Sequence, residues 1–186
     1  MKHSKNYRHK STKRLIQSEF HFIQKWICAY LLSKSGITVN YILSVRQAFL
    51  PSNMLRGQIK PKKPDIRFDS YDKLILSYAK LAQLTNAKSL NIGTEMNFMQ
   101  NQYQDRWIQL IEKVRQVYDG ELLYSFNFDT VRGIHSIEFV KLLDYIGVDA
   151  YFPLNLPDNA STDMLEKEWE GRFSKWKNHC GNIQLS

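Results

Sequence analysis

The chain has 186 residues, of which 43% are hydrophobic and 24% are charged, so it is long enough to form one domain with a sizeable core. Its net charge of +8 comes mostly from the N-terminus, where six Lys and Arg residues precede the first acidic residue. From Ile16 onward, 20 basic residues face 18 acidic ones, which argues against a basic nucleic-acid-binding face. We expect a basic, disordered tail over residues 1–18 and one folded domain over residues 19–186.

The two cysteines and the one apolar stretch near the N-terminus exclude several further classes. Cys28 and Cys180 lack metal-type spacing, and the sequence predicts neither a metal site nor a cofactor. Residues 20–32 are apolar, but Gln24 and Lys25 interrupt them and they are too few to span a membrane. No small-residue cleavage site follows, so we expect a cytoplasmic protein without a membrane partner.

The expected helices and strands alternate along the chain. Residues 20–36 read as a helix, 37–43 as a strand and 50–68 as a long loop with three prolines. Helices are then predicted over residues 70–85, 105–120, 136–145 and 161–179, and strands over 89–95, 121–129 and 145–154. The expected core-facing stripes comprise Leu74, Tyr78, Leu81 and Leu84; Trp107, Leu110, Ile111, Val114 and Val117; Phe139, Val140 and Leu143; and Leu165, Trp169, Phe173 and Trp176.

This alternation predicts an α/β fold of parallel strands joined by crossover helices. The spacing of the strands suits part of a (β/α)₈ barrel, and a doubly wound sheet would share the same alternation. No Gly-rich phosphate loop follows any strand, which disfavours the nucleotide-binding version.

Polar side chains follow three successive predicted strands. The first strand ends at Glu95, the second at Asn127 and Asp129, and the third at Asp149 and Tyr151. In a barrel the carboxyl ends of the strands share one site, and carboxylates, amides and aromatic rings suit a sugar. Asp129 could instead cap a turn and Asp149 could bond a neighbouring loop, whereas Glu95 has little local structural reason to follow a buried strand.

The segments "SYDKLILSYAKLA", "NIGTEMN", "LLYSFNFD" and "YIGVDAYFPL" carry a resemblance to a known family. Over about residues 56–176 the chain resembles glycoside hydrolase family 113, the β-1,4-mannanase-like TIM barrels. The resemblance implies that Glu95 is the general acid/base of a retaining glycosidase. It also implies that Asn127, Phe128 and Asp129 match an Asn-Trp-Asp segment of the family, and that Leu55, Arg56 and Gly57 match a Trp-Arg-Gly segment. Substrate binding is therefore expected from Arg56, Asn127, Phe128, Asp129, Asp149 and Tyr151.

The same resemblance implies a second carboxylate that this sequence lacks. The family's nucleophile is a Glu on the seventh strand, in a segment similar to "TEIGY", and no such segment occurs in the 186 residues. We therefore expect a truncated barrel covering about the third to sixth strands, incomplete at both ends, which is inactive on mannan by itself. Its open sheet edges predict self-association.

Two alternatives to an enzyme remain open from the sequence. One is a non-catalytic carbohydrate-binding remnant that uses Asn127, Asp149 and Tyr151. The other is a nucleic-acid-associated protein that uses the basic tail, which is the less favoured because no recognised nucleic-acid-binding pattern accompanies the tail.

Overall fold

The structure is a computed structural model that describes residues 34, 40–42, 56–151 and 153–180. The expected basic tail and all but one residue of the helix expected over residues 20–36 lie outside the described residues. The same holds for Cys28 and for residues 50–55 of the expected long loop, whereas residues 56–58 of that loop form a short helix and residues 64–68 begin a longer one.

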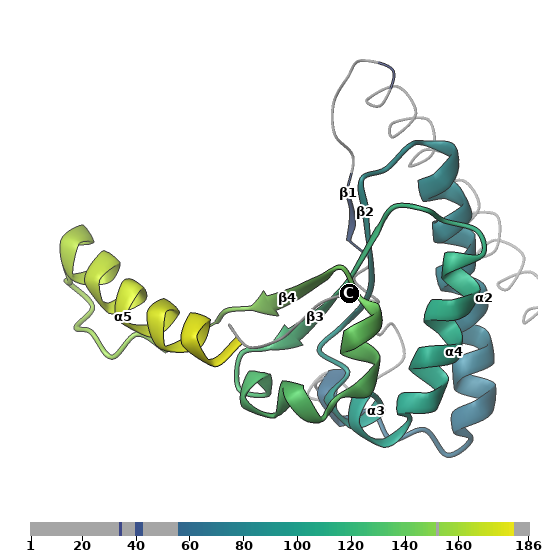
Figure 1. Cartoon of the computed structure of the whole chain (residues 1–186). Coiled ribbons are helices and arrows are strands. Elements are labelled where there is room, and N and C mark those ends of the chain that lie inside the picture. The colour runs from purple at the N-terminus through teal and green to yellow at the C-terminus, as the bar shows by residue number, and fades with distance from the viewer. Residues whose placement is uncertain (1–33, 35–39, 43–55, 152, 181–186) are drawn as a thin grey trace, which may run out of the picture.

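A four-stranded parallel sheet forms the centre of the described structure (Figure 1). The strands are β1 (Asn40–Ile42), β2 (Ser89–Thr94), β3 (Glu121–Asn127) and β4 (Tyr145–Asp149), and they lie side by side in chain order. A doubly wound sheet reverses its strand order at a switch point, whereas a barrel adds each strand next to the last. The order therefore favours part of a barrel and confirms the expected parallel α/β arrangement.

Helices separate the strands, as expected. They are α2 (Pro64–Leu84), α3 (Asn97–Gln102), α4 (Gln104–Arg115) and α5 (Thr162–Cys180), with short 3₁₀ helices η1 (Arg56–Gln58), η2 (Val131–Ser136) and η3 (Glu138–Leu142). In Figure 1, α2 and α4 lie side by side against one face of the sheet, while α5 lies beyond β4 and away from both. No helix in these ranges is long and apolar enough to cross a membrane.

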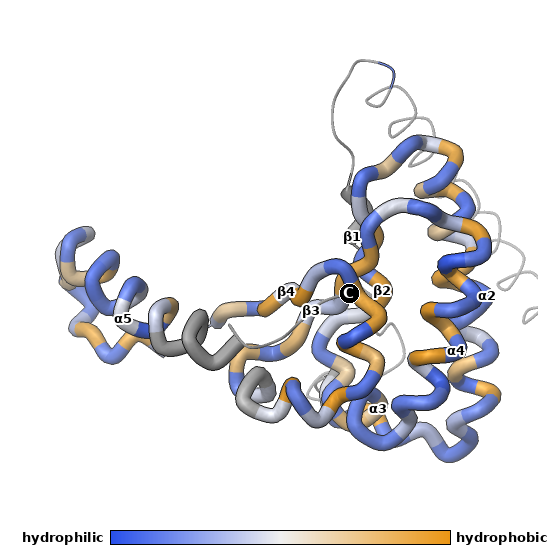
Figure 2. The backbone as a smooth tube through the Cα atoms, in the orientation of Figure 1, coloured by the Kyte–Doolittle hydropathy of each residue, from blue (hydrophilic) through white to orange (hydrophobic). Residues whose placement is uncertain are grey.

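An aromatic cluster fills the space between the helices and the sheet. Trp107 of α4 is fully buried, and its ring lies 5.6 Å from that of Phe68, 5.2 Å from that of Tyr124 and 5.5 Å from that of Phe139. The whole expected stripe of α4 is buried except Val117, which is partly buried. Figure 2 shows the resulting pattern, with hydrophobic stretches in β2 to β4 and alternating hydropathy along α2 and α4.

Helix α2 differs from the prediction in its start and in its buried face. It begins at Pro64, six residues before the expected Ser70, because proline fits the first turn, where no intrahelical donor is needed. Its buried apolar residues are Phe68, Tyr71, Ile75, Ala79, Leu81 and Ala82. Leu74 and Leu84 of the expected stripe are exposed. Leu81 of that stripe is buried and Tyr78 is partly buried against the core, so two of its four residues face inward as predicted.

The segment expected as a helix over residues 136–145 contains the 3₁₀ helix η3 instead, and the 3₁₀ helix η2 ends at its first residue, Ser136. Ile137 has an extended backbone, with φ −99° and ψ 105°, and it separates η2 from η3. Short pieces of 3₁₀ helix are the usual form of such interrupted connections. Phe139, Val140 and Leu143 are nevertheless buried, as predicted.

Helix α5 forms where it was expected, but its apolar stripe does not face a core. Leu165, Trp169 and Phe173 are 40–45% exposed. Figure 1 shows α5 beyond β4, with the α2–α4 layer on the opposite side of that strand. The side chain of Trp176 lies outside the described residues.

Candidate active site

The end of β2 is shaped by an irregularity in its pairing with β3. Asn91 is in register with Leu123 and Thr94 with Ser125, so β2 contains one extra residue between these two pairs. The Asn91 side chain supports this bulge. Its amide nitrogen donates to the Ser125 hydroxyl at 2.7 Å, and its oxygen accepts from the Gly93 N–H at 3.0 Å. Bulges commonly re-aim a side chain beside an active site, and here the strand leads directly into Glu95.

Glu95 has a backbone conformation that few non-glycine residues adopt. Its φ is +52°, in the left-handed region, and its N–H donates to the Ser125 carbonyl at 2.8 Å. The side chain is half-buried. A strained residue that is held in place by its neighbours often belongs to a functional site. The geometry therefore gives Glu95 a fixed position at the C-terminal end of β2.

Buried tyrosines hold the backbone on both sides of Glu95. The Met96 N–H donates to the Tyr124 hydroxyl at 3.0 Å, and the Tyr71 hydroxyl donates to the Ile92 carbonyl at 2.8 Å. Burial raises the pKa of Tyr71 well above its usual value, so its phenol remains a neutral donor. Gly93 lies against the Tyr124 and Trp107 rings, since a Cβ there would be 2.5 Å from Cε2 of Tyr124 and 3.0 Å from the Trp107 ring. The core therefore fixes the strand end from behind.

Asn127 and Asp149 lie next to each other at the C-terminal ends of β3 and β4. They are in register on β3 and β4, so their side chains leave the sheet on the same face. Both residues are half-buried. Oδ1 of Asn127 is buried and has no hydrogen-bond donor among the described residues. The backbone carbonyl of Asn127 accepts from both the N–H and the hydroxyl of Thr130, which fixes the turn that follows.

The other expected substrate-binding residues are placed less closely. Phe128 is half-buried, and Asp129 is exposed in the turn whose hydrogen bonds Thr130 makes. Tyr151 is 80% exposed, because β4 ends at Asp149 and the Tyr151 N–H bonds back to the Asp149 carbonyl. Arg56 begins η1, and its side chain lies outside the described residues.

A supporting layer of small and polar residues was not anticipated. Asn91, Ser125 and Gly147 occupy three neighbouring strands, and a Cβ on Gly147 would lie 2.7 Å from the Ser125 hydroxyl. Gly147 thereby makes room for the Asn91–Ser125 hydrogen bond. An asparagine inside an otherwise apolar strand was the available signal, because a buried amide in a strand requires partners.

The arrangement offers two different carboxylates with β3 between them. Glu95 follows β2 and Asp149 ends β4, so their backbones are separated by two strand spacings, about 10 Å. Retaining glycoside hydrolysis needs two carboxyl groups about 5–5.5 Å apart. Within the described residues, the strand ends therefore present the carboxylates of Glu95 and Asp149 on strands that are not neighbours, with hydrogen-bonding groups between them. The described part of the chain contains no group of three His, Cys, Asp or Glu side chains suited to a metal ion.

Parallel strands in chain order, with polar side chains gathered at their carboxyl ends, define one side of a (β/α)₈ barrel. A family model, Glycoside Hydrolase Family 113, matches residues 53–183. The chain belongs to glycoside hydrolase family 113.

Solved structures show the same fold. A GH113 beta-1,4-mannanase matches with a TM-score of 0.66 and 20% identity, over 86% of this chain and 48% of that chain. A complex structure of a GH113 beta-1,4-mannanase matches with a TM-score of 0.62 and 22% identity, over 82% and 46%. The GH113 beta-mannanase AaManA from Alicyclobacillus acidocaldarius, in complex with ManMIm, matches with a TM-score of 0.60 and 24% identity, over 80% and 47%.

The chain thus spans about half the length of the solved structures it matches. No curated protein matches the sequence.

Proposed function

We propose that this chain carries the acid/base side of a glycoside hydrolase site for β-1,4-linked mannan or mannooligosaccharides. In this proposal Glu95 protonates the glycosidic oxygen that leaves and later activates water, as the acid/base of a retaining enzyme does. Asn127 and Asp149 bind sugar hydroxyls. The proposal rests on Glu95, whose backbone is held in a left-handed conformation just after β2. It lies at the same end of the strands as Asn127 and Asp149.

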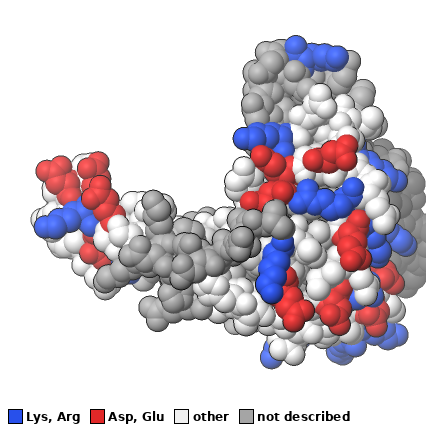
Figure 3. All heavy atoms as spheres, viewed as in Figure 1, with Lys and Arg blue, Asp and Glu red and all other residues white. Residues whose placement is uncertain are grey.

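The expected behaviour of the 186-residue chain by itself is binding without hydrolysis. Asp149 ends the strand after next, and its backbone lies about 10 Å from that of Glu95 by strand spacing, so we do not expect the two to form the close carboxyl pair that retention needs. The family resemblance and the mannanase neighbours support a mannan-type ligand. Figure 3 shows acidic and basic side chains interspersed on one face of the molecule, so neither sign of charge dominates that face.

Calorimetric titration with mannotetraose tests the binding part of this proposal. Asn127→Ala and Asp149→Ala should each weaken binding by about tenfold or more, because each removes a hydrogen bond worth about 1–2 kcal/mol. Asp158→Ala is the matched control, since Asp158 is exposed in a turn beyond β4, and its affinity should equal that of the unaltered chain. Equal affinity in the unaltered chain and in all three variants would contradict the assignment of the C-terminal strand ends as the sugar site.

We also propose that the chain self-associates with a second copy through its open edge at β4 and the exposed face of α5. β4 is an edge strand of the described sheet, and Tyr145 on it is 49% exposed. Helix α5 lies beyond β4 (Figure 1), and its Leu165, Trp169 and Phe173 are 40–45% exposed. Uncovered strand edges and contiguous apolar side chains favour pairing between chains.

Light scattering after size-exclusion chromatography measures this association. The mean molar mass in solution should rise with concentration. The double variant Trp169→Lys with Phe173→Lys should lower that mass toward the monomer's. Ile66→Lys serves as the control, because Ile66 is exposed on α2, away from β4. A monomer at every concentration would rule out the association.

A further inference from the structure

The described sheet has two different edges. β1 lies at one edge and β4 at the other, and the pairings between them are all parallel and in chain order. A (β/α)₈ barrel consists of eight parallel strands in chain order, in which the last strand pairs with the first. Two copies of this sheet therefore supply eight strands in the required direction when β4 of each copy pairs with β1 of the other.

The two long helices that lie between described strands each pack against the strand that follows them. α2 precedes β2, and the Tyr71 hydroxyl of α2 donates to the Ile92 carbonyl of β2 at 2.8 Å. α4 precedes β3, and its Trp107 ring lies 5.2 Å from the Tyr124 ring of β3. A right-handed crossover places a helix over the strands that it connects. By the same rule α5 packs against a strand after β4, and the described ranges contain no such strand.

The surfaces that would contact this strand are exposed. Leu165, Trp169 and Phe173 of α5 form one apolar stripe, and they are 40–45% exposed. β4 is exposed or half-buried at every residue, whereas β2, which has a strand on each side, is buried at all six of its residues. A strand beside β4 would cover both the strand edge and the stripe.

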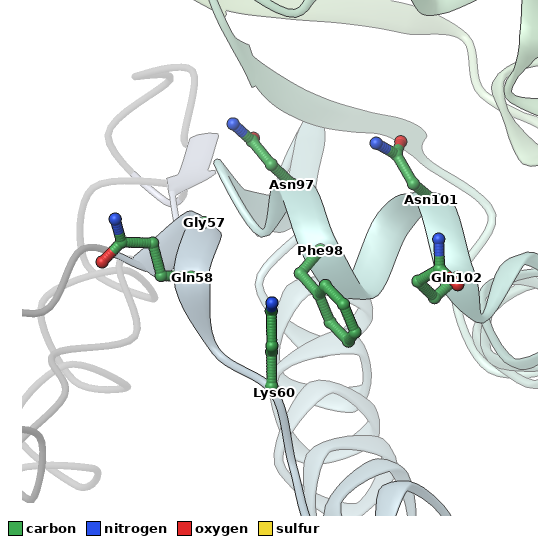
Figure 4. A pocket seen from close by; sticks show the side chains of 7 residues that line it. All are labelled: Gly57, Gln58, Lys60, Asn97, Phe98, Asn101 and Gln102. Atoms are coloured by element: carbon green, nitrogen blue, oxygen red, sulfur yellow. The ribbon is translucent and has the colours of Figure 1, made fainter.

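The segments that follow neighbouring strands also contact each other at the C-terminal ends of those strands. η1 comes after β1 and packs against α3, which follows β2, since a Cβ on Gly57 would lie 3.2 Å from Cγ of Asn97. Figure 4 shows the hollow of about 550 Å³ between these two segments, lined among others by Lys60 and Phe98. The segment after β4 leaves the sheet at Tyr151, which is 80% exposed. A β1 strand beside β4 would bring an η1 segment against it.

We propose that two copies of this chain close one eight-stranded barrel, in which β4 of each copy pairs in parallel with β1 of the other. The inference rests on the self-association proposed above and specifies its geometry. Each copy uses its β1 edge and its β4 edge once, so the head-to-tail contact closes after two copies and does not continue into a fibre. The α5 stripe of each copy then covers β1 of the other, as α2 and α4 cover β2 and β3.

Closure gives one shared site that is made of strand ends from both copies. Asp149 of one copy borders the end of β1 of the other, so the site is complete only in the dimer. The Glu95 residues of the two copies lie four strands apart, on opposite sides of the barrel. Closure therefore does not create the close carboxyl pair of a retaining enzyme, and the dimer is expected to bind sugar and leave it intact.

Cross-linking between strand ends tests this arrangement. Ile42→Cys and Ala150→Cys place one thiol at the C-terminal end of β1 and one just after β4, each in a separate chain whose two native cysteines are replaced by serine. An equimolar mixture is treated with a bismaleimide that spans two strand spacings, about 10 Å. It should give a linked species at twice the 22.0 kDa of one chain. Either chain alone should stay unlinked, because like strand ends lie on opposite sides of the barrel.

Lys80→Cys mixed with Ala150→Cys is the matched control. Lys80 is exposed near the end of α2 that leads into the start of β2, so it lies at the opposite end of the strands from Ala150 and should give no link. Circular dichroism equal to that of the unaltered chain shows that each variant folds. Tyr41→Cys replaces Ile42→Cys if the latter does not fold.

The outcomes separate this inference from the proposed function. A dimer by light scattering that gives no link between residues 42 and 150 would overturn the closed barrel and leave self-association standing. A monomer at every concentration would overturn both. Sugar binding by the strand ends is judged by the Asn127→Ala and Asp149→Ala titrations, which do not depend on the cross-link.

Discussion

Replacement of Trp107 by alanine is expected to remove most of the stability of the domain. The indole is fully buried among Phe68, Tyr71, Tyr124 and Phe139, and its N–H donates to the Met99 carbonyl at 3.2 Å. Truncation of a buried tryptophan lowers the free energy of unfolding by about 3–5 kcal/mol. The free energy of unfolding of a whole domain is only about 5–15 kcal/mol. Urea unfolding followed by circular dichroism should show a transition midpoint at a much lower urea concentration, or no folded baseline.

Leu84→Ala is the control for the Trp107 variant. Leu84 is an apolar helix residue too, but it is 72% exposed at the end of α2. Its replacement should change the free energy of unfolding by no more than about 0.5 kcal/mol. A Trp107→Ala protein as stable as Leu84→Ala would mean that the aromatic cluster does not form the core.

Gly93→Ala is expected to destabilise the chain and to disturb the proposed site together. The added methyl would lie 2.5 Å from Cε2 of Tyr124 and 3.0 Å from the Trp107 ring, and neither ring can move freely in a packed core. Overpacking of this kind costs about 1–3 kcal/mol. Because the Tyr124 hydroxyl accepts from the Met96 N–H, displacement of the ring should also shift Glu95. Thermal unfolding and mannotetraose affinity should both decrease.

Gly171→Ala provides the matched glycine control. Gly171 lies inside α5, and nothing lies within 4 Å of a Cβ added there. Alanine in a helix interior is favoured over glycine by about 0.5–1 kcal/mol, so this variant should be slightly more stable and should bind normally. If Gly93→Ala behaved in the same way, the close packing at the end of β2 would be refuted.

Sequence reasoning predicted the order of the strands and the end of β2 because these depend on local patterns. The α4 stripe of Trp107, Leu110 and Val114 was the best apolar face of its segment, and it is buried. In α2 two stripes with helical spacing competed. The one with Phe68, Tyr71 and Ala79 is buried, whereas the other is buried at Leu81 and exposed at Leu74 and Leu84. Which stripe packs depends on the shape of the neighbouring sheet, which local patterns do not contain.

The predicted site residues divide in the same way. Glu95, Asn127 and Asp149 end three adjacent parallel strands, so the alternation of helices and strands was sufficient to place them at one edge. The bulge beside Glu95 depends on the register between β2 and β3, which the sequence of β2 does not determine. Tyr151 was placed with the others because it was expected inside a strand of residues 145–154. β4 ends at Asp149, and the chain turns outward before Tyr151.

Incubation of the purified 186-residue chain with mannotetraose, at a concentration where titration shows the sugar bound, tests the central claim most directly. The chain is proposed to hold the acid/base Glu95 without a carboxylate close enough to act as nucleophile. Product analysis by chromatography should therefore show intact mannotetraose, with no shorter sugars above the level in buffer. Release of shorter mannooligosaccharides by the chain, abolished in Glu95→Gln, would contradict the account, because it would show that a second catalytic group acts with Glu95.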